Sequence, residues 1–375
     1  MAFLPDFLYL NYLVPFLVVL TVLVFVHELG HYTVARINGV RIEVFSIGFG
    51  PELFGWTDRA GTRWKFSVVP LGGYVRMLGE GDERSGDPSL EGLSESFSQK
   101  RLGQRAAIVA AGPITNFLFA IVAFAILFAT VGQPYSAPIV GTVVPQSAAE
   151  EAGFRGGDRI LAIDGTTIDR FEEVQQVVRM SNGAPLAMSV QREGEAAPVT
   201  IVVQPRLTQT ADADGTPQQA YMLGLQRSGT PLKQHNPASA LWAATQETYA
   251  LSVGTLRYVG EMIVGKRGTE ELGGPIRIGQ MSGEFAKRGI VPLVWFMALL
   301  SINLGLINLF PVPMLDGGHL AFYAVEAVRG RPLGERTQEY GFRIGMVLVI
   351  ALMIFVTYKD LGYFRIFEYF KNIVS

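Results

Sequence analysis

The stretch His27-Glu28-Leu29-Gly30-His31 directly follows residues 8–26, an apolar run without a charged side chain. Its pattern is H-E-x-x-H. Positions i and i+4 share one face of a helix, so the two histidines can hold one zinc ion while Glu28 acts as general base toward a water molecule at the metal. Ionisable groups at the end of a segment long enough to cross a bilayer are costly and are functional by default. A chance match on a soluble helix is the alternative.

Composition places the chain among membrane proteins with some soluble mass. Of its 375 residues, 49% are hydrophobic and only 17% are charged. The net charge of -2 gives no indication of a nucleic-acid partner. The absence of cysteine excludes disulfides, cysteine–zinc sites and a thiol nucleophile. No Lys or Arg precedes Arg36, so we expect the first apolar run to be a retained membrane helix, not a secretory signal.

Long apolar stretches predict about four membrane-spanning helices, at residues 7–37, 106–131, 291–310 and 341–358. The second contains Ala111-Gly112-Pro113-Ile114-Thr115-Asn116-Phe117, whose small residues allow close helix packing. We interpret Asn116 as a polar contact between helices and not as a catalytic group. Residues 237–264 have helical periodicity with interspersed charges, which predicts an amphipathic helix at the membrane interface. A fifth crossing is the alternative for this segment.

Two glycine-punctuated segments, residues 40–49 and 64–77, are rich in β-branched and aromatic side chains and predict short strands. Turns or close approaches are expected at Gly48-Phe49-Gly50-Pro51 and at Pro70-Leu71-Gly72-Gly73-Tyr74. A hairpin beside a membrane site could offer its edge to an extended peptide, but a small sheet covering the helix end fits these residues equally well. The acidic, Ser- and Gly-rich residues 79–99 predict a mobile loop.

A soluble insert follows the second spanning helix. Its Gly-rich segments at 141–145 and 156–165, a helix at 171–180 and strands at 186–192 and 199–204 resemble a PDZ domain of the bacterial, circularly permuted type. Residues 222–225 could supply a last strand, and the polar residues 207–234 predict a linker or long loop. PDZ domains bind extended peptides by strand addition; a steric cap without a bound peptide is the alternative.

The third spanning helix leads into Asn308-Leu309-Phe310-Pro311-Val312-Pro313-Met314-Leu315-Asp316-Gly317-Gly318-His319. Two prolines break the helix here, which is tolerated at membrane depth where the chain is buried in protein or lines a cavity. A catalytic zinc needs three protein ligands and one open position, so Asp316 or His319 could complete the set. We favour Asp316, because it follows the break directly and a carboxylate buried in a membrane needs a partner.

The distribution of Lys and Arg predicts the orientation in the membrane. Ten of them, Arg36 through Arg105, lie between the first two spanning helices, and four follow the third helix, at Arg329, Arg331, Arg336 and Arg343. By the positive-inside rule both loops are cytoplasmic, and both termini and the insert are outside. The zinc motif and Asp316 then both lie toward the cytoplasmic side. The basic residues of the C-terminal tail argue mildly for the reverse.

These motifs together resemble the site-2 protease family, specifically the bacterial regulator-of-sigma-E group. The match runs through H-E-x-x-H, A-G-P-x-x-N-F, the PDZ pattern, Gly273-Gly274-Pro275-Ile276 and the N-x-x-P-x-P-x-x-D-G segment ending in Asp316-Gly317. The resemblance implies a zinc intramembrane protease of the bacterial inner membrane, with Asp316 as third ligand. It implies single-span substrates that another protease has already cut, such as anti-sigma factors or signal-peptide remnants.

The resemblance also implies substrate-handling roles for Asn308, with Pro311 and Pro313, and for the β-region around Gly48 and Gly50. Some family members have two tandem PDZ domains, whereas this insert has clear sequence for one. The other functional classes are a membrane ion transporter with the same ligands and a non-cleaving scaffold. Transport gives no reason for Glu28, and an intact ligand set argues against an inactive enzyme.

The resulting prediction is a polytopic α-helical membrane protein with a membrane-associated β-hairpin region and an inserted extracytoplasmic α+β PDZ domain. Its partners are membrane-spanning peptides and the lipid bilayer. The predicted order is helix 1 with the zinc motif (1–37), the hairpin region and loop (38–103), helix 2 (104–132), the PDZ-like domain (133–229), an extracytoplasmic amphipathic-helix region (230–290), helix 3 with the third ligand (291–328), and helix 4 with the C-terminal tail (329–375).

Overall fold

The computed structural model describes residues 10–80, 94–211, 217–229, 232–265, 268 and 273–363. The chain folds into two compact units. The first, the membrane unit, consists of Met1–Leu127 and Pro237–Ser375, and the second, the inserted unit, consists of Phe128–Asn236. The membrane unit is therefore discontinuous in sequence, because the inserted unit leaves and rejoins it between two of its helices.

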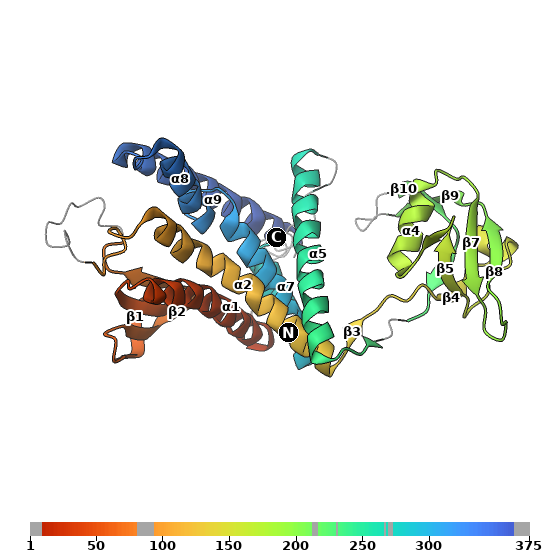
Figure 1. Cartoon of the computed structure of the whole chain (residues 1–375), viewed down its shortest axis with the longest axis horizontal. Helices are drawn as coiled ribbons and strands as arrows, with labels where there is room; N and C mark the ends of the chain where they lie inside the picture. The colour runs from red at the N-terminus through yellow and green to blue at the C-terminus, as the bar shows by residue number, and fades with distance from the viewer. Residues whose placement is uncertain are drawn as a thin grey trace, which may run out of the picture. The chain divides into compact units, whose positions relative to one another are not determined.

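Four helices in the described part of the chain are long and apolar enough to cross a membrane, as predicted. They are α1 (Leu10–Ile37), α2 (Leu102–Thr130), α7 (Ile290–Leu309) and α9 (Glu335–Tyr363), labelled in Figure 1. The segment 237–264 forms helix α5 (Pro237–Ile263), which is not among these candidate spans. The length and composition of α5 therefore give no support to a fifth crossing, and its placement at the membrane interface stays a prediction.

Small residues bring α1, α2 and α7 into close contact. A β-carbon added to Gly30 of α1 would clash with the carbonyl oxygen of Ala111 and with Thr115 Oγ1 of α2. Gly305 of α7 lies in the same way against Pro113 and Phe117 of α2. Without a hydrophobic driving force inside a bilayer, helices associate through such close packing and through polar contacts, so these glycines fix the relative positions of the three helices.

The motif Gly273-Gly274-Pro275-Ile276 begins the short helix α6 (Pro275–Lys287). The carboxylate of Asp360 in α9 is only 2% exposed and accepts backbone N–H bonds from Gly274, Ile276 and Arg277 at 2.8, 3.0 and 3.1 Å. A carboxylate is favourable at a helix N-terminus because the first N–H groups have no partner within the helix. Asp360 therefore ties α6 to α9, while Gly283 of α6 packs on Tyr12 of α1.

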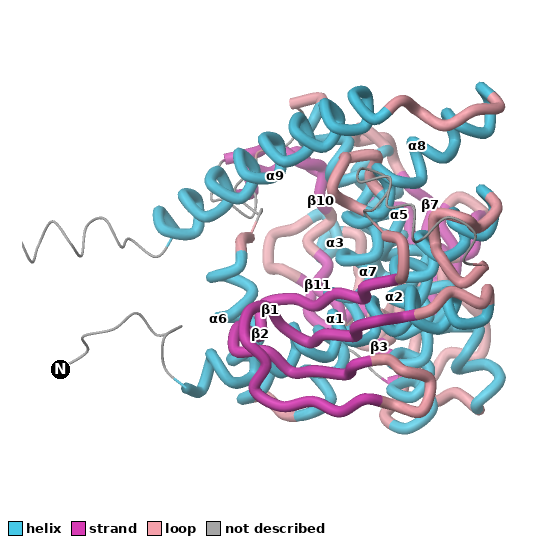
Figure 2. The backbone as a smooth tube through the Cα atoms, turned by 90° about the vertical axis from the view of Figure 1, so that its left-hand side faces the viewer, coloured by secondary structure: helices cyan, strands magenta, loops and turns pink. Residues whose placement is uncertain are grey.

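The predicted strands near residues 40–49 and 64–77 are present and extend further, as β1 (Ile42–Thr57) and β2 (Arg63–Met77). Their register aligns residues 42–47 with both 73–77 and 63–66, while residues 49–57 pair with 63–69. Four segments consequently lie side by side in the order 73–77, 42–47, 63–69 and 49–57 (Figure 2). The predicted mobile loop at 79–99 lies mostly outside the described residues.

Two local features shape this sheet. Gly48 has a φ of 91°, and a β-carbon on it would lie 2.7 Å from the Val69 carbonyl oxygen, so the bend between segments 42–47 and 49–57 requires glycine. Asp58 closes the turn from β1 to β2, because its carboxylate accepts N–H bonds from Ala60, Thr62 and the Trp64 indole at 2.9, 3.0 and 2.9 Å.

The interruption predicted from the two prolines lies between α7 and helix α8 (Asp316–Arg329). Met314 adopts a φ of 94°, which is unusual for a residue with a side chain. Gly317 and Gly318 pack directly on the backbone of the preceding link, where a β-carbon would clash with the Leu309 and Val312 carbonyl oxygens. After this tight link, Asp316 is the first residue of α8, and its carboxylate lies next to His27 and His31 of α1.

The inserted unit contains a four-stranded antiparallel sheet in the order β6-β5-β7-β8 and the helix α4 (Phe171–Met180). Its core includes Ile160, Val174, Met188 and Leu223, all buried. The strand bounds are β4 (Val140–Val143), β5 (Arg159–Ile163), β6 (Thr166–Thr167), β7 (Leu186–Gln191) and β8 (Val199–Val203). Ser147 is the N-cap of helix α3 (Ala148–Glu151), and its side chain accepts a hydrogen bond from the Glu150 backbone N–H.

The prediction of a linker or long loop at 207–234 is wrong. Strands β9 (Arg206–Ala211) and β10 (Pro217–Met222) form an antiparallel pair, β11 (Leu225–Arg227) pairs with β4, and β12 (Leu232–Lys233) pairs with β3 (Gln133–Pro134). The strand pair can form from a polar segment because backbone hydrogen bonds hold it together. Tyr221 packs against Gly183, where a β-carbon would lie 2.6 Å from its ring. Composition alone does not detect such a hairpin.

We expect the stability of the inserted unit to depend on pH through Asp158, which is 1% exposed. Burial opposes ionisation, but two bonds of 2.8 Å from Arg192 and one from the Arg155 backbone N–H outweigh it and lower the pKa of Asp158. A depressed folded-state pKa adds stability above the unfolded-state pKa of about 4, and this stability is lost as pH falls through the folded-state pKa.

Replacing Asp158 with Asn should therefore lower the free energy of unfolding of this unit by about 3 kcal/mol at pH 7, since it leaves the Arg192 charge without its partner. The loss should shrink as the pH is lowered below 4. Hydrogen exchange of the β5 and β7 amides in the full-length chain measures both quantities. Equal unfolding free energies for the variant and the wild type at pH 7 would contradict the assignment.

Candidate metal centre

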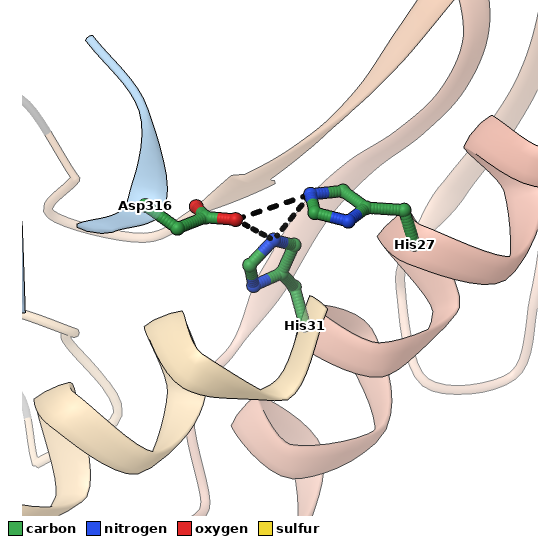
Figure 3. Close-up of side chains that lie close together, drawn as sticks. All are labelled: His27, His31 and Asp316. Carbon is green, nitrogen blue, oxygen red and sulfur yellow. Dashed lines mark hydrogen bonds and ion pairs between the residues drawn. The ribbon is translucent and has the colours of Figure 1, made fainter. Parts of the chain in front are cut away.

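Three side chains from two distant parts of the chain meet in the membrane unit. Helix α1 presents His27 and His31 one turn apart, and the start of α8 presents Asp316 (Figure 3). Asp316 Oδ2 lies 3.2 Å from His27 Nε2 and 3.5 Å from His31 Nε2, and the two Nε2 atoms are 3.2 Å apart. Within the described residues, these three form the one group of histidine and acidic side chains arranged to hold a metal ion.

The three donor atoms have the spacing that a zinc ion requires. Tetrahedral zinc with bonds of about 2.0–2.1 Å separates its ligand atoms by about 3.3 Å, and the observed separations are 3.2, 3.2 and 3.5 Å. Asp316 Oδ2 is buried and accepts no hydrogen bond in the part of the chain that the structure describes. A buried carboxylate oxygen needs a cation or a donor, and a zinc ion between Oδ2 and the two Nε2 atoms would supply the cation, so the residues present fit zinc.

Helix α2 forms the opposite wall of the site through residues spaced four apart, Ile108, Gly112 and Asn116. The carbonyl oxygen of Ile108 accepts a hydrogen bond from His31 Nδ1 at 2.9 Å, and the side-chain amide of Asn116 lies 3.1 Å from His27 Nδ1. Gly112, between them, leaves room for both imidazoles, because a β-carbon there would lie within 2.8 Å of His27 Cε1 and closer still to His31. This row on α2 thus faces the His27–His31 row on α1.

Glu28 lies beside the cluster without belonging to it. It is close enough to His27, His31 and Asp316 to interact electrostatically with each of them. The edge segment 73–77 runs past it: a β-carbon on Gly73 would lie 3.4 Å from Glu28 Cγ, and the Val75 backbone N–H interacts with the Glu28 carboxylate. A carboxylate near the candidate metal ligands that is not one of them is a candidate proton acceptor.

The other predicted site residues are not members of the metal group. Asn308 is in the last turn of α7 and is partly buried, and Pro311 and Pro313 are in the link that ends at Asp316. Gly48 and Gly50 lie at the bend of β1, with φ values of 91° and 88°. The two predicted turns contain four glycines, Gly48, Gly50, Gly72 and Gly73. Among these four, Gly73 is the one that lies next to Glu28.

His319, the alternative third ligand, lies one turn further along α8 and is not in the metal group. Its ring is 5.2 Å from the ring of Phe342 in α9. His235 belongs to the inserted unit, where its Nε2 is 3.2 Å from Gln133 Oε1. The two histidines of the H-E-x-x-H motif are therefore the histidines that this centre uses.

The prediction that Asn116 makes a polar contact between helices is confirmed, and the partner on α1 is the candidate metal ligand His27. The contacts of Ile108 and Gly112 with the two imidazoles were not predicted. The sequence does contain a sign of all three: their spacing of four residues puts them on one face of α2, matching the spacing of the two histidines. Which face of α2 meets α1 depends on packing, so this sign is recognised only once the helices are placed.

The site combines two histidines, one carboxylate and a second carboxylate outside the metal group. It lies among helices long enough to cross a membrane. These features define the class of metal-dependent hydrolases in membrane proteins. Comparison with known proteins supports this class. The model of the family described as Peptidase family M50 matches residues 15–352. The chain belongs to peptidase family M50, and it is a zinc metalloprotease.

Similar proteins cover nearly the whole chain. A zinc metalloprotease, as its name describes it, from Rhizobium meliloti is 46% identical over 367 residues, covering 94% of this chain and 97% of that protein. One from Agrobacterium fabrum is 45% identical over 363 residues, covering 94% and 96%. The regulator of sigma E protease of Salmonella typhi is 32% identical over 443 aligned residues, covering 93% and 98%. These likenesses confirm the predicted family, the protease class and zinc as cofactor.

The alignment with the Salmonella protein is 68 positions longer than this chain of 375 residues, so that relative has segments that this chain lacks. Among solved structures, the PDZ domain of the SdrC-like protein from Listeria monocytogenes is 18% identical with a TM-score of 0.20, covering 25% of this chain and 90% of that domain.

Proposed function

We propose that this protein is an intramembrane endopeptidase in which His27, His31 and Asp316 hold the zinc ion and Glu28 moves the proton. The observation that supports it most directly is the triangle of donor atoms, with sides of 3.2, 3.2 and 3.5 Å, among helices long enough to span a membrane. A zinc ion in such a site polarises the scissile carbonyl and acidifies water.

Glu28 supplies the acid–base chemistry. Its carboxylate takes the proton from the attacking water as the carbon–oxygen bond forms, and it gives that proton to the amide nitrogen as the carbon–nitrogen bond breaks. The products are one new carboxyl terminus and one new amino terminus. Glu28 can perform both transfers because it lies near the ligands without being one of them.

The substrate would be a peptide bond within a membrane-spanning segment of a single-span protein. A helix uses its own backbone groups in hydrogen bonds, so the segment must unwind before it is cut. We infer that segment 73–77 holds the unwound substrate extended by strand addition. This segment is one edge of the four-segment sheet, and it passes Glu28 at Gly73 and Val75.

The remaining predicted residues would handle the substrate. Asn308 precedes the α7–α8 link, in which Pro311 and Pro313 remove backbone donors. Gly48 and Gly50 allow the bend between the inner segment 42–47 and the edge segment 49–57. The family resemblance favours anti-sigma-factor-type proteins or signal-peptide remnants, already shortened by another protease, as substrates. The Salmonella relative is named as a regulator of sigma E protease, which agrees with the first of these.

A cleavage assay with metal removal tests the proposal. The full-length protein in lipid vesicles, given a tagged single-span substrate, should cut it within the spanning segment. Removal of the metal by a chelator should abolish the cut, and added Zn²⁺ should restore it. Fragment masses identify the bond. Cleavage only outside the spanning segment, or cleavage that survives removal of the metal, would contradict the proposal.

We also propose that the protein lies in the bacterial inner membrane with the metal centre toward the cytoplasm and the inserted unit outside. The Lys and Arg of the segments between α1 and α2 and between α7 and α9 support this orientation. Reporters fused at Arg59 and at Arg331 should then be cytoplasmic, and one fused at Gly194 should be extracytoplasmic. A cytoplasmic result at Gly194 would reverse the proposed topology.

A further inference from the structure

The Nδ1 atoms of the two imidazoles in the metal centre face different kinds of hydrogen-bonding groups. A neutral histidine that binds a metal through Nε2 has its proton on Nδ1, so whatever faces Nδ1 must accept a hydrogen bond. For His31 that group is the backbone carbonyl of Ile108, at 2.9 Å. A carbonyl can only accept, so His31 is held in the tautomer that leaves Nε2 free.

His27 is held by a group of a different kind. Its Nδ1 lies 3.1 Å from the side-chain amide of Asn116, and its Nε2 lies 3.2 Å from Asp316 Oδ2. An amide has an acceptor oxygen and a donor NH₂ of nearly the same size, so it can face Nδ1 with either one. With the NH₂ group facing Nδ1, Asn116 Oδ1 is buried and lacks a hydrogen-bond partner in the described residues.

Rotating the amide by half a turn exchanges its oxygen and nitrogen with little change of shape. Oδ1 then faces His27 and can accept its Nδ1–H, which satisfies the buried oxygen and leaves Nε2 with a lone pair. In the other rotamer, the NH₂ group donates to Nδ1, and Nε2–H can donate to Asp316 Oδ2. Both arrangements keep His27 neutral, so the change moves no charge into the membrane.

Asn116 is held firmly enough to perform this task. The residue is fully buried, and its backbone carbonyl accepts a hydrogen bond of 2.9 Å from Ser301 Oγ of α7, which is also fully buried. One helical turn before it, Gly112 lets α2 approach both imidazoles. Asn116 therefore sits where α1, α2 and α7 meet, and its side chain has His27 as its polar neighbour.

We propose that Asn116 is a positioning residue for the metal centre, whose amide selects the tautomer of His27. Its oxygen accepts the Nδ1–H of His27 when zinc is held, and its NH₂ group donates to Nδ1 when the site is empty. This inference rests on the proposed function, since it takes His27, His31 and Asp316 as the zinc ligands. It adds a residue that the ligand set does not include.

The test uses the small number of histidines in this chain, which are His27, His31, His235 and His319. The full-length protein is labelled with ¹⁵N-histidine, and its ring nitrogens are observed by NMR with and without Zn²⁺. Single replacements of His235 and His319 by Gln assign their signals. Zinc affinity is measured in parallel by competition with a chelator. The variants are Asn116→Leu, which removes both hydrogen-bonding groups, and Asn116→Asp, which keeps only acceptors.

In the wild type, added Zn²⁺ should move the proton of His27 from Nε2 to Nδ1 and shift the Nε2 signal. Asn116→Leu should weaken zinc binding about 10–100-fold, the usual effect of losing a group that orients a metal-bound histidine. Asn116→Asp should retain zinc affinity within about threefold of the wild type and should favour the Nδ1–H tautomer even without metal. A residue that only packed helices would not give this difference, since a carboxylate fits that role no better than leucine.

Zinc affinity in Asn116→Leu within threefold of the wild type, or equal losses in the Leu and Asp variants, would overturn the proposal. If Asn116→Leu fails to fold, the wild-type spectrum still decides, because a zinc-loaded His27 without a proton on Nδ1 contradicts the role. Ring signals of His27 and His31 that do not respond to Zn²⁺ would remove the proposed ligand set and this inference together. If the ring signals of His27 and His31 respond to Zn²⁺ but the Asn116 substitutions do not change zinc affinity, only this inference would be removed.

Discussion

Replacing Glu28 with Gln should abolish peptide cleavage while the protein keeps its zinc ion and its fold. Glutamine has the shape of glutamate but cannot take a proton from water, and loss of a general base typically lowers the rate about 10²–10⁴-fold. Zinc should remain because Glu28 is not in the group formed by His27, His31 and Asp316. Turnover of a single-span substrate and the zinc content of the same preparation measure the two effects.

A matched control for this change is Glu339→Gln, which makes the same carboxylate-to-amide replacement on α9. Glu339 forms an exposed ion pair with Arg343 at 2.6 Å, and such pairs contribute little to stability. This variant should cleave at the wild-type rate. Loss of zinc in Glu28→Gln would instead make Glu28 a ligand, and unchanged cleavage would transfer the role of base to another group.

Replacing Asp316 with Asn should abolish cleavage and also weaken zinc retention, by more than about 100-fold. The change keeps the size of the side chain but removes the negative charge from an oxygen that lies 3.2 and 3.5 Å from the two Nε2 atoms. Losing a ligand should cost more than the 10–100-fold that is typical for losing a group that supports one. Competition with a chelator measures the affinity.

His319→Ala is the informative comparison, since His319 is the other residue of α8 with suitable chemistry. Its ring packs near Phe342, outside the metal group, so its removal should weaken zinc binding by no more than about 10–100-fold. If His319→Ala strips the metal while Asp316→Asn retains it, the two residues exchange roles. A similar small effect of both substitutions would mean that the third ligand lies elsewhere.

The spanning helices, the His27–His31 pair and the helix break before Asp316 could be predicted from the sequence because they depend on local patterns. Twenty apolar residues in a row must form a helix in a bilayer, where every backbone group needs an internal partner. The spacing of His27 and His31 puts them on one face of whatever helix contains them. The prolines at 311 and 313 forbid a continuous helix, which explains why α8 starts afresh at Asp316.

The hairpin β9–β10 could not be predicted in this way. Its sequence is largely polar, the side chains of residues 206–209 are exposed, and the strand pairing is made by backbone groups that every sequence has. Composition therefore indicated a linker. Only the pairing with a partner strand and the contact between Tyr221 and Gly183 distinguish these residues from a loop.

By itself, the sequence determined that this protein has about four spanning helices, an H-E-x-x-H pair at the end of the first, and a carboxylate after a break that follows the third. Tertiary structure decided that Asp316 and not His319 meets the histidines, that Gly73 approaches Glu28, and that Ile108, Gly112 and Asn116 face both rings. The physical reason is that periodicity fixes which residues share a face, whereas the rotation and depth of each helix depend on how glycines and polar groups of neighbouring helices pack.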